Sequence, residues 1–409
     1  MKKTTRKKIG IITFYHHNYN YGGVLQAYAL QKYLENQGFD AKQISFDPFG
    51  HIKQAPKSYS LINRIKGNLK KYGLFTTINI YLTTTKEKIL NCFCKNKINE
   101  ANEIIKTRKI IIDKFKKQIP HTSKIYNEQT IHECEKFSSY ISGSDQIWLK
   151  QNGKLSDAYL LNFVEQNKTK NCYAAGPDFS HYEESEKEYI IKSIKNYNNI
   201  SVREKNTALY INQMFKAYEN NQMAYEVLDP VFLLNDKEWD VICKKQENIK
   251  HPYVFIYLLG DDNKIHKEVN KFCKNNNLKS MIVSYPLHKY NNINYDMFDY
   301  VFTDGPAEFI SAIKNAEFVI TDSYHATALS IILKINFCVL NRANHQVGDQ
   351  FTSERIDNLL TNLHLNTRKT KPKPHNIKEA YTDKIDYIKT NKSLQKSLTI
   401  SIAFLDKII

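Results

Sequence analysis

The stretch Phe318-Val-Ile-Thr-Asp-Ser-Tyr-His-Ala-Thr-Ala-Leu-Ser-Ile-Ile-Leu-Lys334 decides the fold of this chain, because a β-rich run passes at Asp322-Ser323 directly into a helical pattern. The start of a helix carries unpaired N–H groups and the positive end of the helix dipole, so it favours anions. Ser323 can cap these groups, and His325 in the first turn adds a proton donor beside a bound phosphate. The alternative is an ordinary strand-to-helix junction whose histidine merely lies near a cap.

The N-terminal region has the pattern of a βαβ unit. A predicted strand at Ile9–Phe14 leads through a loop at residues 16–23 into a helix at Val24–Leu34, and Ala41–Phe46 is the next strand. The loop lies at the carboxyl end of its strand, where open parallel sheets bind ligands, and its two glycines allow a ligand to approach the backbone closely. The residues expected to shape this cleft are Asn20, Gly22, Gly23 and Gln26.

Six short motifs follow one another along the chain. They are NYGGVLQAYAL at 20–30, GSDQIW at 143–148, YAAG at 173–176, ISVRE at 200–204, LDPVFLL at 228–234 and TDSYHATALS at 321–330. In this order and at these separations the sequence resembles the polysaccharide pyruvyltransferase family. The resemblance implies a transfer of pyruvate from phosphoenolpyruvate onto sugar hydroxyls as a ketal. One departure is Ala326, which stands where that family usually has glycine.

The resemblance also implies an α/β fold with two Rossmann-like domains that face a cleft, as in GT-B glycosyltransferases, and a C-terminal helix that crosses back to the first domain. A length of 409 residues suits two or three domains, and the βαβα alternation after residue 253 calls for a parallel sheet. We expect an N-terminal domain at 1–238 with a basic helical insertion at 51–118, a linker at 239–252, a C-terminal domain at 253–375 and a helical segment at 376–409.

Phosphoenolpyruvate carries a carboxylate and a phosphate on one carbon, so its site needs cations and backbone donors at two points. Arg203 is the candidate for bidentate recognition, because a planar guanidinium matches carboxylate or phosphate oxygens where lysine does not. Its alternative role is a surface ion pair with Glu204. Arg355 could also touch the donor, or it could pair within its own helix. The expected donor-binding residues are therefore Arg203, Ser323, Tyr324 and Arg355.

Ketal formation needs a proton at C3 of the enol and removal of protons from the attacking hydroxyls. His325 is the candidate general acid, and the alternative is that it only hydrogen-bonds the phosphate. Asp145 is the candidate base, or else it caps a helix that leads to Trp148. Ser144 and Gln146 flank it and are expected at the acceptor side. Asp229, which precedes Pro230, is expected to fix a turn rather than to react.

The formal net charge of +17 is concentrated in one segment. Residues 51–118 hold 16 Lys and Arg against 4 Asp and Glu. Apolar residues such as Leu61, Ile65 and Leu69 recur there at helical spacing, so we expect amphipathic helices that could lie on an anionic membrane and meet a lipid-linked acceptor. A solvated, lysine-rich surface is the alternative. The six lysines expected to carry this docking are Lys66, Lys70, Lys71, Lys114, Lys116 and Lys117.

Other functional classes are weighed against the same features. The seven cysteines are odd in number and scattered, which indicates reduced thiols in the cytoplasm, and no apolar run is long enough to span a membrane. Neither a metal-ligand spacing nor a nucleic-acid-binding module is evident, so we expect no metal, no cofactor and no nucleic-acid partner. A nucleotide-sugar glycosyltransferase of GT-B architecture remains the alternative function, since fold does not decide chemistry.

Overall fold

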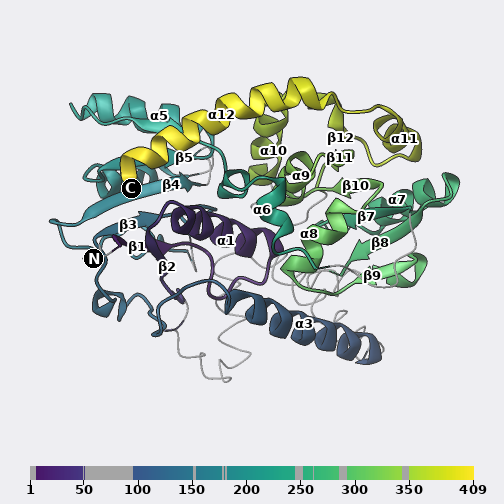
Figure 1. Cartoon of the computed structure of the whole chain (residues 1–409), viewed down its shortest axis with the longest axis horizontal. Coiled ribbons are helices and arrows are strands. Elements are labelled where there is room, and N and C mark those ends of the chain that lie inside the picture. The colour runs from purple at the N-terminus through teal and green to yellow at the C-terminus, as the bar shows by residue number, and fades with distance from the viewer. Residues whose placement is uncertain are drawn as a thin grey trace, which may run out of the picture.

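Two parallel β-sheets of six strands each lie side by side in the computed structural model (Figure 1). Their strand orders are β2-β1-β3-β4-β5-β6 and β12-β11-β10-β7-β8-β9. The structure describes residues 6–48, 50, 95–150, 153–176, 179, 182–244, 252–260, 262–284, 293–342 and 350–409. The prediction of two Rossmann-like α/β domains is confirmed.

The N-terminal sheet reverses its strand order between the neighbouring strands β1 and β3, and every pair in it is parallel. Ligands of such sheets bind beyond the carboxyl ends of the strands at this reversal. The strands are β1 (Lys8–Ile12), β2 (Asp40–Gln43), β3 (Ser139–Ser142), β4 (Thr169–Ala175), β5 (Asn199–Val202) and β6 (Ala224–Glu226). The helices around it are α1 (Tyr21–Asn36), α4 (Glu184–Ile194) and α5 (Lys205–Ala217), with the short turn η1 (Ile131–Glu133).

The C-terminal sheet is built in the same way, with β10 and β7 at the reversal. Its strands are β7 (Tyr253–Tyr257), β8 (Lys279–Val283), β9 (Tyr300–Phe302), β10 (Phe318–Thr321), β11 (Phe337–Leu340) and β12 (Lys369–Thr370). Its helices are α7 (Asn263–Asn275), α8 (Pro306–Lys314), α9 (Tyr324–Ile332), α10 (Gln350–Asn362) and α11 (Pro374–Thr382), with η5 (Tyr295–Met297) and η6 (Asn366–Arg368). The turn η3 (Pro230–Leu233) and α6 (Asp236–Asp240) lead from the first sheet toward the second.

Three local features of the structure were not given by the sequence pattern. Helix α1 begins at Tyr21 and not at Val24, because Asn20 caps it by accepting a hydrogen bond from the N–H of Gly22. Strand β6 ends at Glu226, two residues before the motif LDPVFLL begins with Leu228 and one residue after Tyr225. Strand β12 lies inside a Lys/Pro/Asn-rich stretch where no strand was predicted. Only two residues of this strand pair with β11, which is too short for an alternation of apolar and polar residues to be recognised in the sequence.

Helix α12 (Tyr387–Ile408) crosses from the second domain to the first, as expected (Figure 1). At its start the hydroxyl of Tyr387 donates to the carbonyl of Ile335, 2.8 Å away. Toward its end the Ser401 hydroxyl accepts from the N–H of Leu228 at 2.9 Å, and the ring of Phe404 packs near Tyr225. Both domains therefore hold this helix in place.

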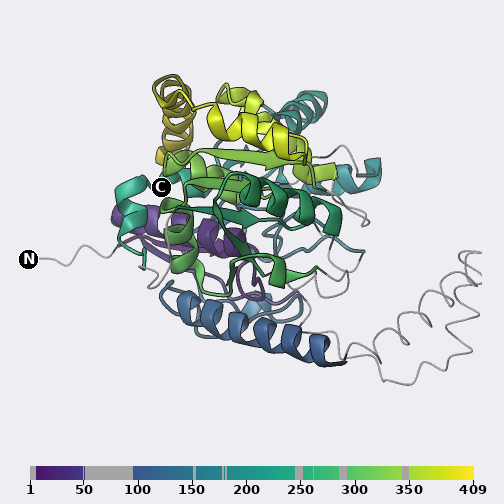
Figure 2. The ribbon, with the colours of Figure 1, turned by 90° about the vertical axis from the view of Figure 1, so that its right-hand side faces the viewer.

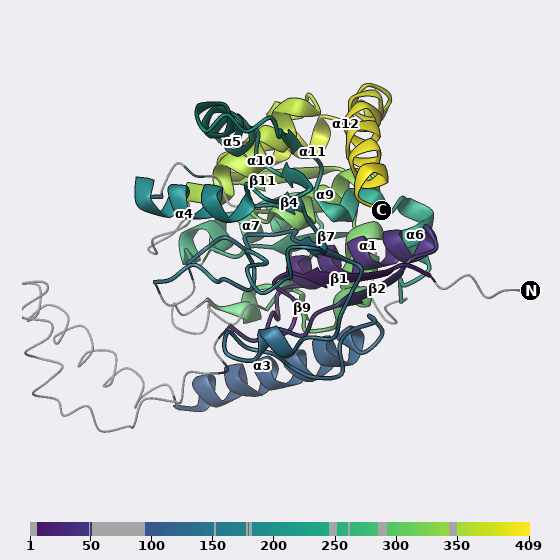
Figure 3. The same cartoon turned by 90° about the vertical axis from the view of Figure 1, so that its left-hand side faces the viewer.

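Helix α3 (Lys95–Lys116) lies on the opposite side of the molecule from α12 (Figures 2 and 3). Most of the basic insertion, residues 51–94, lies outside the described residues, and with it Lys66, Lys70 and Lys71. Lys114 and Lys117 are exposed, whereas Lys116 is buried and its ammonium donates to the carbonyl of His16 at 2.9 Å. Lys116 was expected on a docking surface, and this expectation is wrong. Within the described part of the chain, no helix is both long enough and apolar enough to cross a bilayer.

Tyr21 joins the two domains. Its ring stacks on Phe309 with 4.4 Å between centroids, and the guanidinium of Arg108 on α3 lies 4.3 Å from the ring centroid. Its hydroxyl donates to the carbonyl of Asp304 at 2.6 Å. One aromatic side chain of the first domain thus fills a site made by α8 and its neighbours in the second.

We predict that Tyr21→Ala lowers the free energy of unfolding by about 3–5 kcal/mol, because a fully buried aromatic side chain is removed from the domain interface. Tyr21→Phe should cost about 1 kcal/mol, since only one hydrogen bond is lost. Urea denaturation measures both. Tyr218→Ala, at an exposed tyrosine of the first domain, is the control. Equal losses in Tyr21→Ala and Tyr218→Ala would contradict the interface role.

Candidate active site

Side chains from five separate segments meet where the carboxyl ends of the two sheets face each other. Arg203 follows β5, Asp229 follows β6, and Asp145 lies in the loop after β3. From the second domain, His325 and its neighbours begin α9, and Arg355 lies on α10. The predicted catalytic and donor-binding residues are thus brought together from positions far apart in the chain.

Arg203 is buried and tied to carboxylates. Its Nη1 donates to Asp229 Oδ2 at 2.8 Å and its Nε to Glu204 Oε1 at 3.2 Å, while Asp145 Oδ1 lies 3.9 Å from Nη2. Burial alone would lower the pKa of Arg203, but Glu204, Asp229 and Asp145 together hold it above its usual value. The pair with Glu204 exists, but Arg203 is a buried residue at a strand end and not a surface arginine.

Asp229 does more than fix the turn that the sequence predicted. Its Oδ1 accepts from the N–H of Val231, which is that turn. Its Oδ2 accepts from Arg203 and, at 3.3 Å, from the hydroxyl of Ser144, and it lies 3.5 Å from Nε2 of His325. Burial raises the pKa of Asp229, but His325 and Arg203 outweigh it and hold the pKa below its ordinary range. The prediction missed this role, because nothing in the motif LDPVFLL indicates which cations will face the carboxylate.

Arg355 and Arg203 lie around the ring of Tyr324. The guanidinium carbons are 5.5 and 5.0 Å from the ring centroid. Nη2 of Arg203 and both Nε and Nη1 of Arg355 are buried without a hydrogen-bond partner among the residues that the structure describes. Burial and the nearby Arg203 lower the pKa of Arg355 to about 10. Convergent buried cations with unused donors are the features of an anion site. Asp145 Oδ1 lies 4.0 Å from Arg355 Nη1, and we see no ion pair of Arg355 within the described part of its own helix.

His325 packs against the first turn of α1. A Cβ placed on Gly22 would lie 2.2 Å from Nδ1 of His325, so only glycine lets the imidazole occupy this position. A Cβ on Gly23 would likewise lie 2.0 Å from Nδ2 of Asn18. The sequence predicted that a ligand uses the space above these glycines. In the structure, side chains of the protein occupy it, and both glycines are helical residues and not part of a loop.

Asp145 does not cap a helix, because the residues after it form a turn and no helix. Its φ of +71° is in the left-handed region, which aspartate tolerates better than most residues. Its carbonyl accepts from the N–H of Gly176 at 3.0 Å, which fixes the loop to the end of β4. The carboxylate lies between the two arginines, with Oδ1 3.9 Å from Nη2 of Arg203 and 4.0 Å from Nη1 of Arg355.

The remaining predicted residues support the site rather than line it. Gln26 is fully buried and donates to Thr13 Oγ1 at 3.1 Å, and Thr13 in turn donates to the carbonyl of Ser144 at 2.7 Å. Asn20 is the cap of α1, and Gln146 is partly exposed on the loop of Asp145. Ser323 stands at the N-cap of α9, but its side chain makes no capping hydrogen bond, so the prediction that it caps the helix is wrong.

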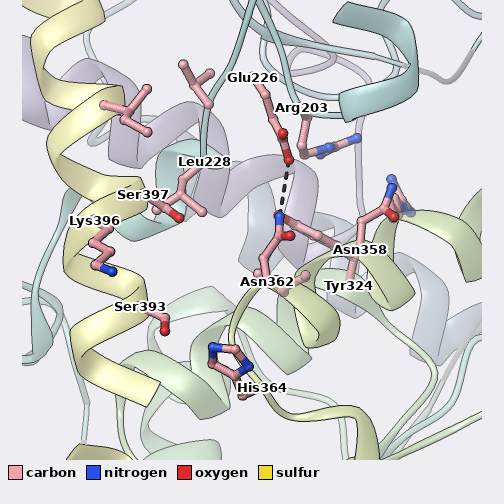
Figure 4. A pocket seen from close by; sticks show the side chains of 14 residues that line it. Arg203, Glu226, Leu228, Tyr324, Asn358, Asn362, His364, Ser393, Lys396 and Ser397 are labelled. Atoms are coloured by element: carbon pink, nitrogen blue, oxygen red, sulfur yellow. Dashed lines mark hydrogen bonds between the residues drawn. The ribbon is translucent and has the colours of Figure 1, made fainter. Parts of the chain in front are cut away.

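A cavity of about 370 Å³ adjoins the arginines (Figure 4). The residues that line it come from the ends of β5 and β6, from α9 and α10, and from α12. Asn358 and Asn362 of α10 were not predicted, although with Arg355 they recur at helical spacing on one face of a single helix. Among the described residues, no group of three or more His, Cys, Asp and Glu side chains is placed to hold a metal ion.

Solved structures similar to this chain share its fold. The UDP-GlcNAc 2-epimerase of Methanocaldococcus jannaschii matches with a TM-score of 0.51 and 12% identity over 97% of this chain and 99% of its own. The UDP-N-acetylglucosamine 2-epimerase of Rickettsia bellii matches with a TM-score of 0.52 and 9% identity over 98% and 97%. At these identities the likeness concerns the fold alone. No curated protein matches the chain in sequence.

The family comparison covers most of the chain. The model of the polysaccharide pyruvyl transferase family matches residues 20–344, from the cap of α1 to just beyond β11. The matched region includes Arg203, Asp229 and His325. The chain belongs to the polysaccharide pyruvyl transferase family.

Proposed function

We propose that the protein transfers pyruvate from phosphoenolpyruvate onto two hydroxyls of a sugar in a surface glycan or its lipid-linked precursor, forming a pyruvate ketal and releasing phosphate. The observation that carries the proposal is the pair of arginines around Tyr324, in which Nη2 of Arg203 and both Nε and Nη1 of Arg355 are buried without a hydrogen-bond partner in the described structure. They lie at the start of α9, beside the one histidine of the family motif.

The donor fits this arrangement through its charge. Phosphoenolpyruvate carries its carboxylate and phosphate close together, so a site for it needs cations that approach from two directions. Arg203 and Arg355 provide them, and the N–H groups of the first turn of α9 add the positive end of a helix dipole. The side chain of Ser323 makes no capping hydrogen bond to these N–H groups, so it does not compete with an anion at this end of the helix.

The reaction takes place in two steps at C2, an addition followed by a substitution. In the first, a sugar hydroxyl adds to C2 while C3 takes up a proton, which gives a tetrahedral carbon that still carries phosphate. In the second, a neighbouring hydroxyl forms the other C–O bond and the C2–O bond to phosphate breaks. His325 would supply the proton at C3, and Asp229, 3.5 Å away, would stabilise its cationic form. Asp145 would accept or orient the hydroxyl protons.

The same proposal includes where in the cell the enzyme works. A lipid-linked acceptor would bring the enzyme to the inner face of a membrane, and exposed Lys114 and Lys117 at the end of α3 would contribute to contact with anionic lipid. The enzyme itself would be cytoplasmic, with phosphoenolpyruvate as its donor and no bound cofactor.

A phosphate-release assay tests the proposal. The purified protein is incubated with glycan intermediates from cells that lack it, and with either phosphoenolpyruvate or a set of nucleotide sugars. We expect phosphate release and a pyruvyl mass increment on the glycan with phosphoenolpyruvate only. Transfer from a nucleotide sugar would replace the proposal with a glycosyltransferase.

We predict that Arg355→Lys raises KM for phosphoenolpyruvate by about 10–100-fold, because a bidentate charge-assisted contact is lost while the positive charge remains. The melting temperature should change little, since the buried Nε and Nη1 have no hydrogen-bond partner in the described structure. Steady-state kinetics and thermal unfolding measure these effects. Glu354→Gln, at the exposed neighbour on α10, is the control, and an unchanged KM in Arg355→Lys would remove Arg355 from the donor site.

Arg203→Lys should behave differently. It leaves Asp229 and Glu204 buried with a poorly matched cation, so we expect a loss of about 3–5 kcal/mol in stability together with the loss of donor binding. Arg355 is therefore the more selective probe of the donor site.

We predict that His325→Gln lowers kcat by on the order of 10²–10⁴ with a modest change in KM for phosphoenolpyruvate, because glutamine keeps a hydrogen bond but supplies no proton. Saturation kinetics decide the outcome. A variant that binds the donor weakly yet reaches the normal kcat at saturation would make His325 a phosphate ligand only.

Gly22→Ala is a matched variant that keeps the imidazole. Its added methyl group would occupy the space of the His325 ring, so kcat should fall although the histidine is present. Full activity in Gly22→Ala would show that the position of the ring against α1 does not matter for the reaction.

A further inference from the structure

The cavity beside the arginines extends well past the donor-binding groups. In Figure 4, Ser393, Lys396 and Ser397 of α12 lie on one side, Asn358 and Asn362 of α10 lie opposite, and Arg203 lies near Glu226. Its volume of about 370 Å³ is within the range of ligand pockets and leaves room after a three-carbon donor has bound.

The lining has the chemistry of a site for a neutral polyol. Two carboxamides, two hydroxyls, an imidazole, an ammonium and a carboxylate face it, and each can donate to or accept from a sugar hydroxyl. Aliphatic side chains supply the surface on which the C–H groups of a pyranose ring pack. The polar set is Glu226, Asn358, Asn362, His364, Ser393, Lys396 and Ser397, and the aliphatic set is Val227, Leu228, Leu359 and Ile400.

Glu226 and Asn362 are the central polar pair of this cavity. The Nδ2 of Asn362 donates to Oε1 of Glu226 at 3.2 Å, which joins the end of β6 in the first domain to α10 in the second. Burial raises the pKa of Glu226, and the hydrogen bond from Asn362 opposes this. A partly buried carboxylate costs stability unless a ligand or a neighbour donates to it. A sugar hydroxyl is such a donor.

We propose that this cavity is the acceptor site, and that it binds the pyranose whose diol receives the pyruvyl group, with α12 as its outer wall. This inference rests on the proposed function, because the diol must reach C2 of a donor held by Arg203 and Arg355. A ketal needs both hydroxyls of one sugar at the same carbon. One continuous space that contains the donor cations and the polar lining meets this requirement.

Helix α12 is hydrogen-bonded to both domains, which indicates its role in the acceptor site. Its start is hydrogen-bonded to the second domain through Tyr387, and its end is bonded to the first through Ser401, directly next to Leu228 of the cavity wall. A change in the angle between the domains would therefore change the width of the acceptor site. The crossing helix serves recognition of the sugar as well as the assembly of the fold.

Three variants test the acceptor site at different points. Ser397→Trp fills the cavity from α12, Asn362→Ala removes a carboxamide, and Glu226→Gln keeps the shape but removes the charge. Gln395→Trp, at an exposed position of α12 that does not line the cavity, is the control for a bulky residue on this helix. The acceptor is the glycan pool from cells that lack the protein, and the donor is radiolabelled phosphoenolpyruvate.

We expect each of the three variants to raise the acceptor KM by about tenfold or more, with the KM for phosphoenolpyruvate within about twofold of wild type. Glu226→Gln should melt at the same temperature as wild type or higher, which separates its effect from misfolding. Gln395→Trp should transfer normally. The inference would be overturned if Ser397→Trp and Glu226→Gln kept the acceptor KM of the wild-type protein. It would also be overturned if the variants raised the KM for phosphoenolpyruvate as much as the acceptor KM.

A second measurement separates this inference from the proposed function. Co-sedimentation with the glycan pool, in the absence of donor, reports acceptor binding alone. One outcome is that the wild-type protein binds the glycan, that Ser397→Trp does not bind it, and that the wild-type protein transfers nothing from phosphoenolpyruvate. In that case the proposed function fails and the sugar site stands. If wild type transfers pyruvate and all three cavity variants do so equally well, the cavity inference fails and the function stands.

Discussion

The buried carboxylate of Asp229 is the group on which the arrangement of the site depends, because it receives contacts from both domains. It accepts hydrogen bonds from Arg203, Ser144 and the N–H of Val231 in the first domain and faces His325 of the second. A carboxylate without solvent is costly unless several donors compensate for lost hydration. The groups that compensate for this cost are Arg203, the loop after β3 that carries Ser144, and His325, so Asp229 fixes their positions relative to one another.

The two arginines have different electrostatic surroundings. Three carboxylates hold the pKa of Arg203 above its usual value, whereas burial and Arg203 itself lower that of Arg355 to about 10. An anion that binds between them would offset the repulsion and use the free nitrogens around Tyr324. Arg203 is thereby fixed by ion pairs within the first domain, whereas Arg355 would gain its partner from the anion of the proposed reaction.

The first turn of α1 connects the domain interface to the chemistry. Tyr21 fills a site in the second domain, and the next residue, Gly22, contacts the ring of His325. On the other side of the molecule, α12 connects the same two domains and lines the cavity. Any motion that opens the cleft would change the position of His325 and the width of the cavity together.

The sequence by itself determined the elements and their order. Apolar strands that end in polar residues or glycine before a helical pattern predicted the two α/β domains, because these signals are local. Arg203 and His325 were singled out by their place in motifs that resemble the family, and the structure brings them together. The packing of Lys116, the contacts of Asp229 with Arg203 and His325, the contact of Gly22 with His325, and the hydrogen bond between Asn362 and Glu226 were decided only by the tertiary structure. Each depends on residues far apart in the chain that meet only when the two domains face each other, and no local pattern encodes that distance.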